Sequence, residues 1–597
     1  MLVDYTRDQF LTEFSKATLR DRYLLPDEKY QDLFARVSKH YSNDDAHAQR
    51  LYGYISNLWF MPATPVLSNG GTNRGLPISC FLNECEDTMN GIADNWWENL
   101  WLAKEGGGIG SYYGNVRSMG EKIGDVGKSS GVIPFIKVQD SMTLAVSQGS
   151  LRRGSAALYL PIHHPEVEDF IDMRRPTGGD PNRKALNLHH GIAIDDAFMK
   201  AVRDDKNYDL KSPKTGKAIH TVKARDLWAK LLTTRIETGE PYLLFIDTVN
   251  KAIPAHHKQL GLKVKTSNLC VEITLPTGVD HLGNNRTAVC CLSSLNLEKY
   301  NEWKDNKEFI LDVMYFLDNV LQDFIDNAKD THAKAVYAAM RERSVGLGVM
   351  GLHYLYQSEG LPFGSKEAYQ LNKDIFKHIN DHVKSANLHI GKERGPCLDA
   401  EECGLELRFS NCTAIAPTAS ISVIAGGSSP GVEPSMANVY VQKTLSGNFE
   451  VHNPYLKKIL AYLGKDNEDV WSSIAVHEGS VQHLDFLDDK TKEVFKTFEE
   501  IEQMDIIRQA GDRQPYIDQS QSVNVLLRPD CSKRYLNLIH MKAWELGLKS
   551  LYYCRSISLQ RADKPSKMIE RKTIAECTDG VCTIPEPVKY EECVACQ

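Results

Sequence analysis

Between about Gly108 and Arg528 the sequence alternates short β-prone runs with longer helical ones, which restricts the fold to few classes. Residues 156–160, 242–246 and 522–527 have the composition of buried strands, whereas apolar side chains from Phe309 to Phe324 recur at helical spacing. Strands separated by helices favour a parallel sheet that the helices cover. The sequence therefore predicts an α/β protein with a largely parallel sheet.

The two ends of the chain differ from this middle part. Apolar residues in the first sixty positions recur at helical spacing, and a turn-rich stretch follows at residues 62–71. A helix is expected around Trp96–Trp101, ending at Gly106–Gly108. After Ser556 the chain becomes polar, as a flexible tail does. We therefore predict a helical region at 1–60, an α/β domain at 61–556 and a mobile tail at 557–597.

The composition excludes several classes of protein. A formal charge of -8 and a pI of about 6.2 leave no general basic field for nucleic acid. No run approaches the roughly 20 apolar residues of a membrane helix, and the N-terminus does not resemble a signal peptide. Fourteen cysteines in 597 residues are too sparse for a disulfide scaffold. We expect a cytoplasmic protein with reduced, reactive thiols.

One short segment, Ser267–Ile273, carries the residues for a chemical site. If it is extended, Asn268, Cys270 and Glu272 lie on one face and the apolar residues between them on the other. Glu272 could then take a proton, Asn268 hold a substrate hydroxyl and Cys270 react. On this segment alone, a polar strand edge with a core cysteine is the simpler interpretation.

Further cysteines lie in two other contexts. Cys80 and Cys290 each occur in an apolar, β-prone run, and two such thiols could deliver two electrons by closing to a disulfide. Sequence cannot show that they meet, and Cys291 lies next to Cys290. The C-terminal pair Cys593 and Cys596 fits a swinging dithiol. The alternative is a zinc site completed by two upstream thiols, Cys577 and Cys582.

Taken together, these segments resemble the large, catalytic subunit of class I ribonucleotide reductase, from about Trp59 to Gln597. The resemblance implies a ten-stranded α/β barrel with Cys270 on a central finger loop. It implies that a thiyl radical on Cys270 removes the 3′-hydrogen of a ribonucleoside diphosphate, while Glu272 and Asn268 bind the sugar hydroxyls. Cys80 and Cys290 would supply the reducing thiols, and Cys593 and Cys596 would restore them.

The same resemblance implies partners. Tyr552 and Tyr553 match a stacked pair that relays the radical from a metal-containing small subunit, so no metal or other cofactor is expected in this chain. The tail dithiol would be reduced by thioredoxin or glutaredoxin. The working unit would be a homodimer, with the Trp96–Trp101 helix at its interface and dNTP or ATP as allosteric effector.

Nucleotide contacts follow from the resemblance in two groups. Those to the substrate are Thr64, Ser79, Gly108 and the phosphate-binding turn Pro417, Thr418, Ala419, Ser420 and Ile421. Those to the effector are Asp87, Thr88, Met89, Arg117, Gly124 and Arg153, the last in a loop at 148–154 that would report the effector to the substrate base.

The pattern departs from many family members at the N-terminus, where fewer than sixty residues precede the resemblance. We therefore expect no ATP-binding cone and no dATP inhibition through this subunit, which a dATP titration of the isolated subunit tests. Three alternatives remain open. They are an adenosylcobalamin-dependent (class II) reductase, a catalytically silent nucleotide-binding regulator and a zinc-ribbon nucleic-acid binder.

Overall fold

The computed structural model describes residues 1–125, 127–148, 152–153, 155–328, 330–444, 447–528 and 530–556, and the backbone of 576–578 and 581–583. Of residues 147–148, 152–153, 443–444 and 447 it describes the backbone alone. The remainder of the predicted tail, including Cys593 and Cys596, lies outside the described residues, as do Gly149–Leu151 and Gly154 of the predicted reporter loop.

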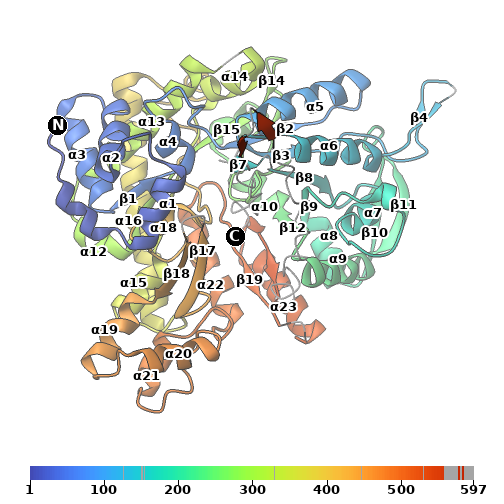
Figure 1. Ribbon diagram of the computed structural model, residues 1–597. Helices are drawn as coiled ribbons and strands as arrows, with labels where there is room; N and C mark the ends of the chain where they lie inside the picture. The colour runs from blue at the N-terminus through green and yellow to red at the C-terminus, as the bar shows by residue number, and fades with distance from the viewer. Residues whose placement is uncertain are drawn as a thin grey trace.

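The N-terminal region is helical, as the spacing of its apolar residues predicts. A 3-10 turn at Tyr5–Phe10 precedes α1 (Glu13–Arg22), α2 (Tyr30–His40) and α3 (Asp45–Ser56), each of which buries one face. These helices lie at one side of the molecule, where α3 packs against α13 (Phe309–Asn327) (Figure 1). The buried residues of α13 include Phe309, Phe316 and Phe324, so its predicted apolar face is confirmed.

A curled sheet with nine strands forms the centre of the molecule. Its hydrogen-bonded order is β1-β15-β2-β3-β8-β9-β12-β20, and β16 pairs with β15. The bounds are β1 Phe60–Pro62, β2 Cys80–Glu84, β3 Gly108–Tyr112, β8 Ser155–Pro161, β9 His189–Ile194, β12 Tyr242–Phe245, β15 Ala288–Asn296, β16 Val345–Met350 and β20 Ser550–Leu551.

Helices connect the parallel strands and cover the outside of the sheet. The strands β2, β3, β8, β9 and β12 run parallel in this order, as do β15 and β16. The connecting helices are α5 Met89–Lys104, α6 Ile133–Ala145, α7 Val167–Asp172, α8 Asp196–Arg203 and α9 Ala224–Thr238, with α13 and α14 (Ala333–Glu342) between β15 and β16. This arrangement confirms the predicted α/β class.

Two further segments close the sheet into a barrel. Leu347 of β16 bridges to Thr413, and Ile415 bridges to Gln521, both in parallel. The chain at 521–526, which includes β19 (Val525–Leu526), then pairs with the last barrel segment through Tyr552 N–H to Val523 O and through β21 (Cys554–Arg555). Eight strands (β2, β3, β8, β9, β12, β15, β16 and β20) and two bridged segments therefore complete a ring of ten.

The remaining elements surround the barrel. The long helix α16 (Lys366–Arg394) packs against α13 and α22 (Gln503–Arg513), and α23 (Lys533–Glu545) precedes β20. A peripheral unit carries the hairpin β17 (Val439–Thr444) and β18 (Gly447–His452) and the helices α19 (Pro454–Tyr462), α20 (Glu468–Val476) and α21 (Asp489–Val494) (Figure 1). Within the described part of the chain, no helix combines the length and apolar character needed to cross a membrane.

Some local predictions were wrong. The stretch at 62–71 is not only turns, because it contains the helix α4 (Thr64–Asn69), in whose first turn Pro65 lies. Proline is favoured there because its missing N–H has no partner to lose. The strand predicted at 522–527 is regular only at β19, and the strand predicted at 242–246 ends at Phe245, where α10 (Ile246–Ala252) begins.

Candidate active site

The segment predicted to be extended, Ser267–Ile273, is instead a tight loop inside the barrel. Val271 has a φ of 63°, and the Asn268 side chain accepts a hydrogen bond from Ile273 N–H at 3.1 Å. The Ser267 hydroxyl donates to Ile273 O at 2.6 Å, which ties the two ends of the loop together. Strict strand alternation therefore does not hold, because side chain–backbone hydrogen bonds turn the chain within five residues.

The loop fits so closely that one barrel position tolerates only glycine. A Cβ atom on Gly110 of β3 would lie 1.7 Å from Ser267 O. On the neighbouring strand β8, the Tyr159 hydroxyl donates to Asn268 O at 2.7 Å. Leu269 and Val271 pack into an apolar cluster with Tyr112, Tyr159 and other barrel side chains. The barrel wall thus fixes the loop from several strands.

Asn268 and Glu272 are fully buried, while Cys270 is partly exposed. Burial raises the pKa of Glu272 to about 7, and hydrogen bonds from its own backbone, Asn268 and Ser522 oppose that rise. A carboxyl with such a pKa exchanges protons readily at neutral pH. The loop therefore presents a thiol beside a proton-accepting group.

Cys80 and Cys290 are directly opposite each other across the antiparallel pair of β2 and β15. Opposed residues in such a pair have Cα atoms about 4.5–5.5 Å apart, which is within the span of a disulfide. Both side chains belong to one small apolar cluster with Ile273 of the loop, whereas Cys291 points into the main core. The geometry therefore favours Cys290 over its neighbour as the partner of Cys80.

The two thiols are linked to the loop by polar contacts. Asn268 donates to the Cys80 sulfur at 3.5 Å, and Ser79 lies 3.7 Å from the same atom. Burial raises the pKa of the Cys290 thiol well above its usual range, so this group is protonated at neutral pH. A dithiol in this state holds two hydrogens and two electrons for a reduction.

Tyr552 and Tyr553 pack with Cys270 in the same cluster of barrel side chains. The Tyr552 hydroxyl donates to the Cys270 sulfur at 3.6 Å, and the centroids of the two tyrosine rings are 4.2 Å apart. A third tyrosine, Tyr242 of β12, packs on both, with centroids at 4.8 Å and 5.1 Å. The thiol thus borders a cluster of three phenols.

Sequence reasoning missed three residues of this site, Tyr242, Gln519 and Ser522. The Gln519 amide accepts from Thr274 N–H at 3.2 Å and donates to the Cys290 sulfur at 3.7 Å. Ser522 donates to Cys270 O at 2.6 Å. The only available signal was the polar run at 519–522 before an apolar stretch, which is also typical of a strand end.

The predicted substrate contacts border the same site. Gly108 pairs with Cys80 across β2 and β3, and its N–H donates to Ser79 O at 2.6 Å. Ala63, next to Thr64, donates its N–H to Leu292 O near Cys290. The turn Pro417–Ile421 follows the bridged segment 413–415; Thr418 has a φ of 58°, and its hydroxyl accepts from Gly431 N–H at 2.7 Å.

The residues predicted to bind the effector, so far as the structure describes them, lie outside the barrel. Arg117 makes an ion pair with Asp87 at 2.8 Å and donates to Lys122 O at 2.7 Å. Thr88 caps α5, whose first residue, Met89, is exposed, and Gly124 lies in the turn between β4 (Lys122–Ile123) and β5 (Gly127–Lys128). Of Arg153 only the backbone is described, in the pair β6 (Ser147–Gln148) and β7 (Arg152–Arg153).

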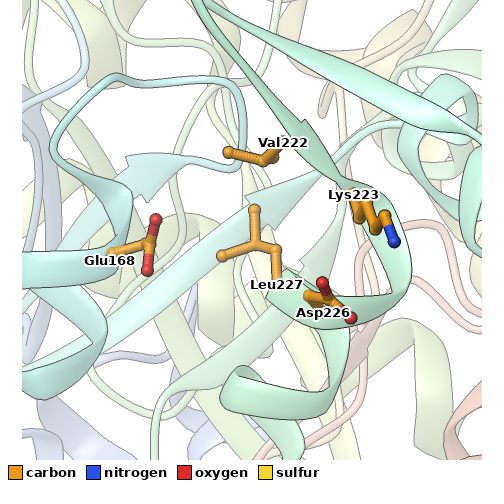
Figure 2. A pocket seen from close by; sticks show the side chains of 5 residues that line it. All are labelled: Glu168, Val222, Lys223, Asp226 and Leu227. Atoms are coloured by element: carbon orange, nitrogen blue, oxygen red, sulfur yellow. The ribbon is translucent and has the colours of Figure 1, made fainter.

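A surface hollow is separate from both groups. It lies between α7, the end of β11 (Ala218–Lys223) and the start of α9, and Figure 2 shows its lining of Glu168, Val222, Lys223, Asp226 and Leu227. None of these residues is a predicted site residue.

Comparisons with known proteins agree with this geometry. The family model for the ribonucleotide reductase barrel domain matches residues 78–403 and 399–554, and that for the all-alpha domain matches residues 9–75. A ribonucleoside-diphosphate reductase large subunit of Invertebrate iridescent virus 3 is 42% identical over 96% of this chain and 99% of its own. The large subunit of Danio rerio is 32% identical over 92% of this chain and 76% of its own.

A solved structure gives the same result. The Actinobacillus ureae class Id ribonucleotide reductase alpha subunit superimposes with a TM-score of 0.82 at 35% identity, covering 94% of this chain and 99% of that one. Family models, relatives and fold therefore agree, and the chain belongs to the ribonucleotide reductase family as a large, catalytic subunit of the class I type.

Proposed function

We propose that this chain reduces ribonucleoside diphosphates to deoxyribonucleoside diphosphates by radical chemistry at Cys270. The observation that carries the proposal is the position of the Cys270 loop: the Cys270 sulfur accepts a hydrogen bond from the Tyr552 hydroxyl, and Asn268 of the same loop donates to the Cys80 sulfur. A radical that reaches Cys270 through Tyr552 therefore arrives on a loop that also contacts a thiol of the proposed reducing pair.

In the proposed reaction, a Tyr552 phenoxyl radical takes the hydrogen atom of the Cys270 thiol. The resulting thiyl radical removes the 3′-hydrogen of the ribose, and Glu272 takes the proton of the 3′-hydroxyl. The 2′-hydroxyl leaves as water, with a proton from the Cys80–Cys290 dithiol. That dithiol supplies two electrons and two protons and becomes a disulfide. Cys270 returns the 3′-hydrogen, Glu272 returns its proton to the 3′-oxygen, and the Cys270 thiyl radical takes its hydrogen atom back from Tyr552. The pair Cys593 and Cys596 would then reduce the disulfide.

A class I large subunit works with a small subunit, and we propose that Tyr552 and Tyr553 receive the radical from that partner. Their ring contact supports a short transfer path. No cofactor is proposed for this chain itself. We further propose a homodimer through α5, effector binding at Asp87, Thr88 and Arg117, and thioredoxin or glutaredoxin as the external reductant.

The test is reduction of a ribonucleoside diphosphate with dithiothreitol and an effector nucleotide, adding either a cognate small subunit or adenosylcobalamin. We expect turnover with the small subunit alone. Turnover with adenosylcobalamin alone would remove the tyrosine relay and the partner. No turnover under either condition would make a silent nucleotide-binding regulator the better description.

A further inference from the structure

One side chain outside the predicted set touches two parts of the proposed machinery. Ser522 lies in the bridged barrel segment, is 2% exposed, and is held by its own N–H, which donates to Ile415 O at 2.9 Å. Its hydroxyl is 2.6 Å from Cys270 O and 3.3 Å from the Glu272 carboxylate oxygen Oε2. The two contacts join the thiol-bearing residue to the proton acceptor.

A hydroxyl has one hydrogen, so Ser522 cannot donate to both acceptors fully at once. When Glu272 is protonated, its O–H can donate to the Ser522 oxygen while Ser522 donates to Cys270 O. When Glu272 is ionised, the carboxylate is the stronger acceptor and competes for the Ser522 hydrogen. A change in the charge of Glu272 therefore alters the hydrogen bond that holds the backbone of Cys270.

We propose that Ser522 is a positioning residue that stabilises the ionised form of Glu272 and couples its protonation to the backbone of Cys270. The inference rests on the proposed function for its role in turnover. Its effect on the Glu272 carboxyl follows from the contacts alone and can be measured without turnover.

Other ionisable groups packed around Glu272 must keep their charge while it titrates if the effect of Ser522 is to be measured. Tyr159 on β8 and Cys290 on β15 sense its charge, and burial raises the pKa of both well above their usual ranges, so both are neutral near pH 7. Cys270 lies on the same loop. Lys549 donates to the carbonyl oxygens of Ile517, Asp518 and Gln519. Burial lowers the pKa of Lys549 to about 8, and this lysine is unchanged in every variant below.

The chain offers a matched control, Ser550. Its hydroxyl also donates to a carbonyl of the loop, Val271 O, at 3.1 Å, and it is equally buried. Its other hydroxyl contacts are Gln521 O and the Ser520 hydroxyl. Replacing Ser550 therefore removes a loop contact of the same type, at the neighbouring residue, and keeps the hydrogen bonds to Glu272 from its own backbone, Asn268 and Ser522.

The experiment is an infrared titration of the Glu272 carboxyl, isolated by subtracting the spectrum of Glu272→Gln in the same background. Ser522→Ala should raise the midpoint by about 0.5–1 pH unit, because the carboxylate loses a donor. Ser522→Thr keeps the hydroxyl and should restore the wild-type midpoint, and Ser550→Ala should leave it unchanged. Ser522→Gly, which also lacks the hydroxyl, replaces the alanine variant if that protein does not fold.

An unchanged midpoint in Ser522→Ala or Ser522→Gly would overturn the proposal, as would an equal shift in Ser550→Ala. In the reconstituted enzyme, kcat/KM should rise with pH as Glu272 ionises. The midpoint of this rise should shift to higher pH by the same amount in Ser522→Ala. If wild-type enzyme reduces no diphosphate, the proposed function fails while the infrared result still decides the contact. If turnover is present but the pH midpoint of kcat/KM does not shift with the infrared midpoint of Glu272, the proposed coupling to the chemistry at Cys270 is wrong.

Discussion

Two regions of this molecule bury carboxylates in opposite ways. Inside the barrel, Glu272 has hydrogen-bond donors around it, and burial raises its pKa to about 7. Between α14 and α17 (Leu398–Glu402), Asp399 is just as buried but binds Arg286 at 2.6 Å and 2.9 Å and Arg341 at 2.7 Å. Burial raises the pKa of Asp399 too, but hydrogen bonds and charge from Arg286, with a contribution from His257, outweigh it and hold the pKa below its usual range.

The difference separates chemistry from stability. A carboxylate locked by guanidinium groups keeps its charge and cannot exchange a proton near pH 7, so it is suited to holding elements together. A buried carboxyl without such a partner is costly to ionise and therefore ready to change state. The comparison predicts that substitutions in the barrel site reduce activity without lowering stability, whereas substitutions at Asp399 lower stability without reducing activity.

The largest effect is expected for Cys270→Ser. An alcohol O–H is too strong a bond to be exchanged with a ribose C–H, so turnover should fall below detection, at least about 10⁴-fold. Nucleotide binding and the thermal midpoint should persist, because the change is isosteric. Steady-state assays with the small subunit, nucleotide binding by calorimetry and thermal melts provide the measurement. Substantial remaining turnover would exclude the thiyl mechanism.

Asp399→Asn should lower the free energy of unfolding by about 3–5 kcal/mol, because it removes the carboxylate that Arg286 and Arg341 share and leaves Asp280 as the carboxylate paired with Arg286. Activity per folded molecule should stay at the wild-type level. Urea denaturation of both proteins, with turnover normalised to the folded fraction, measures the two quantities. A stable but inactive variant would contradict the division between the regions.

A pH series at Glu272 tests the same comparison with a smaller effect. Because burial raises the folded-state pKa of Glu272 to about 7 from its ordinary value of 4.5, the stability that this group confers is fully present below about pH 4.5 and is lost as pH rises through 7. The loss amounts to about 3 kcal/mol. Glu272→Gln should remove this loss, so its advantage over wild type should grow between pH 4.5 and pH 8 in urea denaturation.

Asp399 should behave with the opposite sign. Its pKa is lowered in the folded protein, so the stability from this group is present at neutral pH and is lost as pH falls below the unfolded value of about 4. The difference in the free energy of unfolding between wild type and Asp399→Asn should therefore become smaller in acid. With rising pH, the free energy of unfolding of wild type minus that of the variant should fall for Glu272→Gln and rise for Asp399→Asn. If this difference changed in the same direction for both, the two carboxylates would not differ as described.

Sequence reasoning reached the α/β class because strand and helix periodicities are local. It also singled out Cys270 and Glu272, because they lie in one short segment, and the resemblance to the family implied their roles. It could not reach the shape of that segment: the left-handed Val271 and the close approach at Gly110 depend on strands more than a hundred residues apart. Likewise, Ser522 and Gln519 belong to the site because the chain at 519–522 pairs with the distant segment 413–415. Which of Cys290 and Cys291 faces Cys80 needed the register of β15.

The smallest effect is expected at a cluster in which one carboxylate pairs with several arginines. Asp318 binds three guanidinium groups, those of Arg343 at 2.6 Å, Arg394 at 2.7 Å and Arg408 at 2.9 Å. Arg408→Met keeps much of the apolar stem and leaves two cations on the carboxylate, so the protein should lose only about 1 kcal/mol in urea denaturation. Asp318→Asn is the matched control: it removes the shared partner of all three and should cost several times more. Equal losses would mean that the third guanidinium is not redundant, and that charge balance rather than pairing sets the stability of these buried clusters.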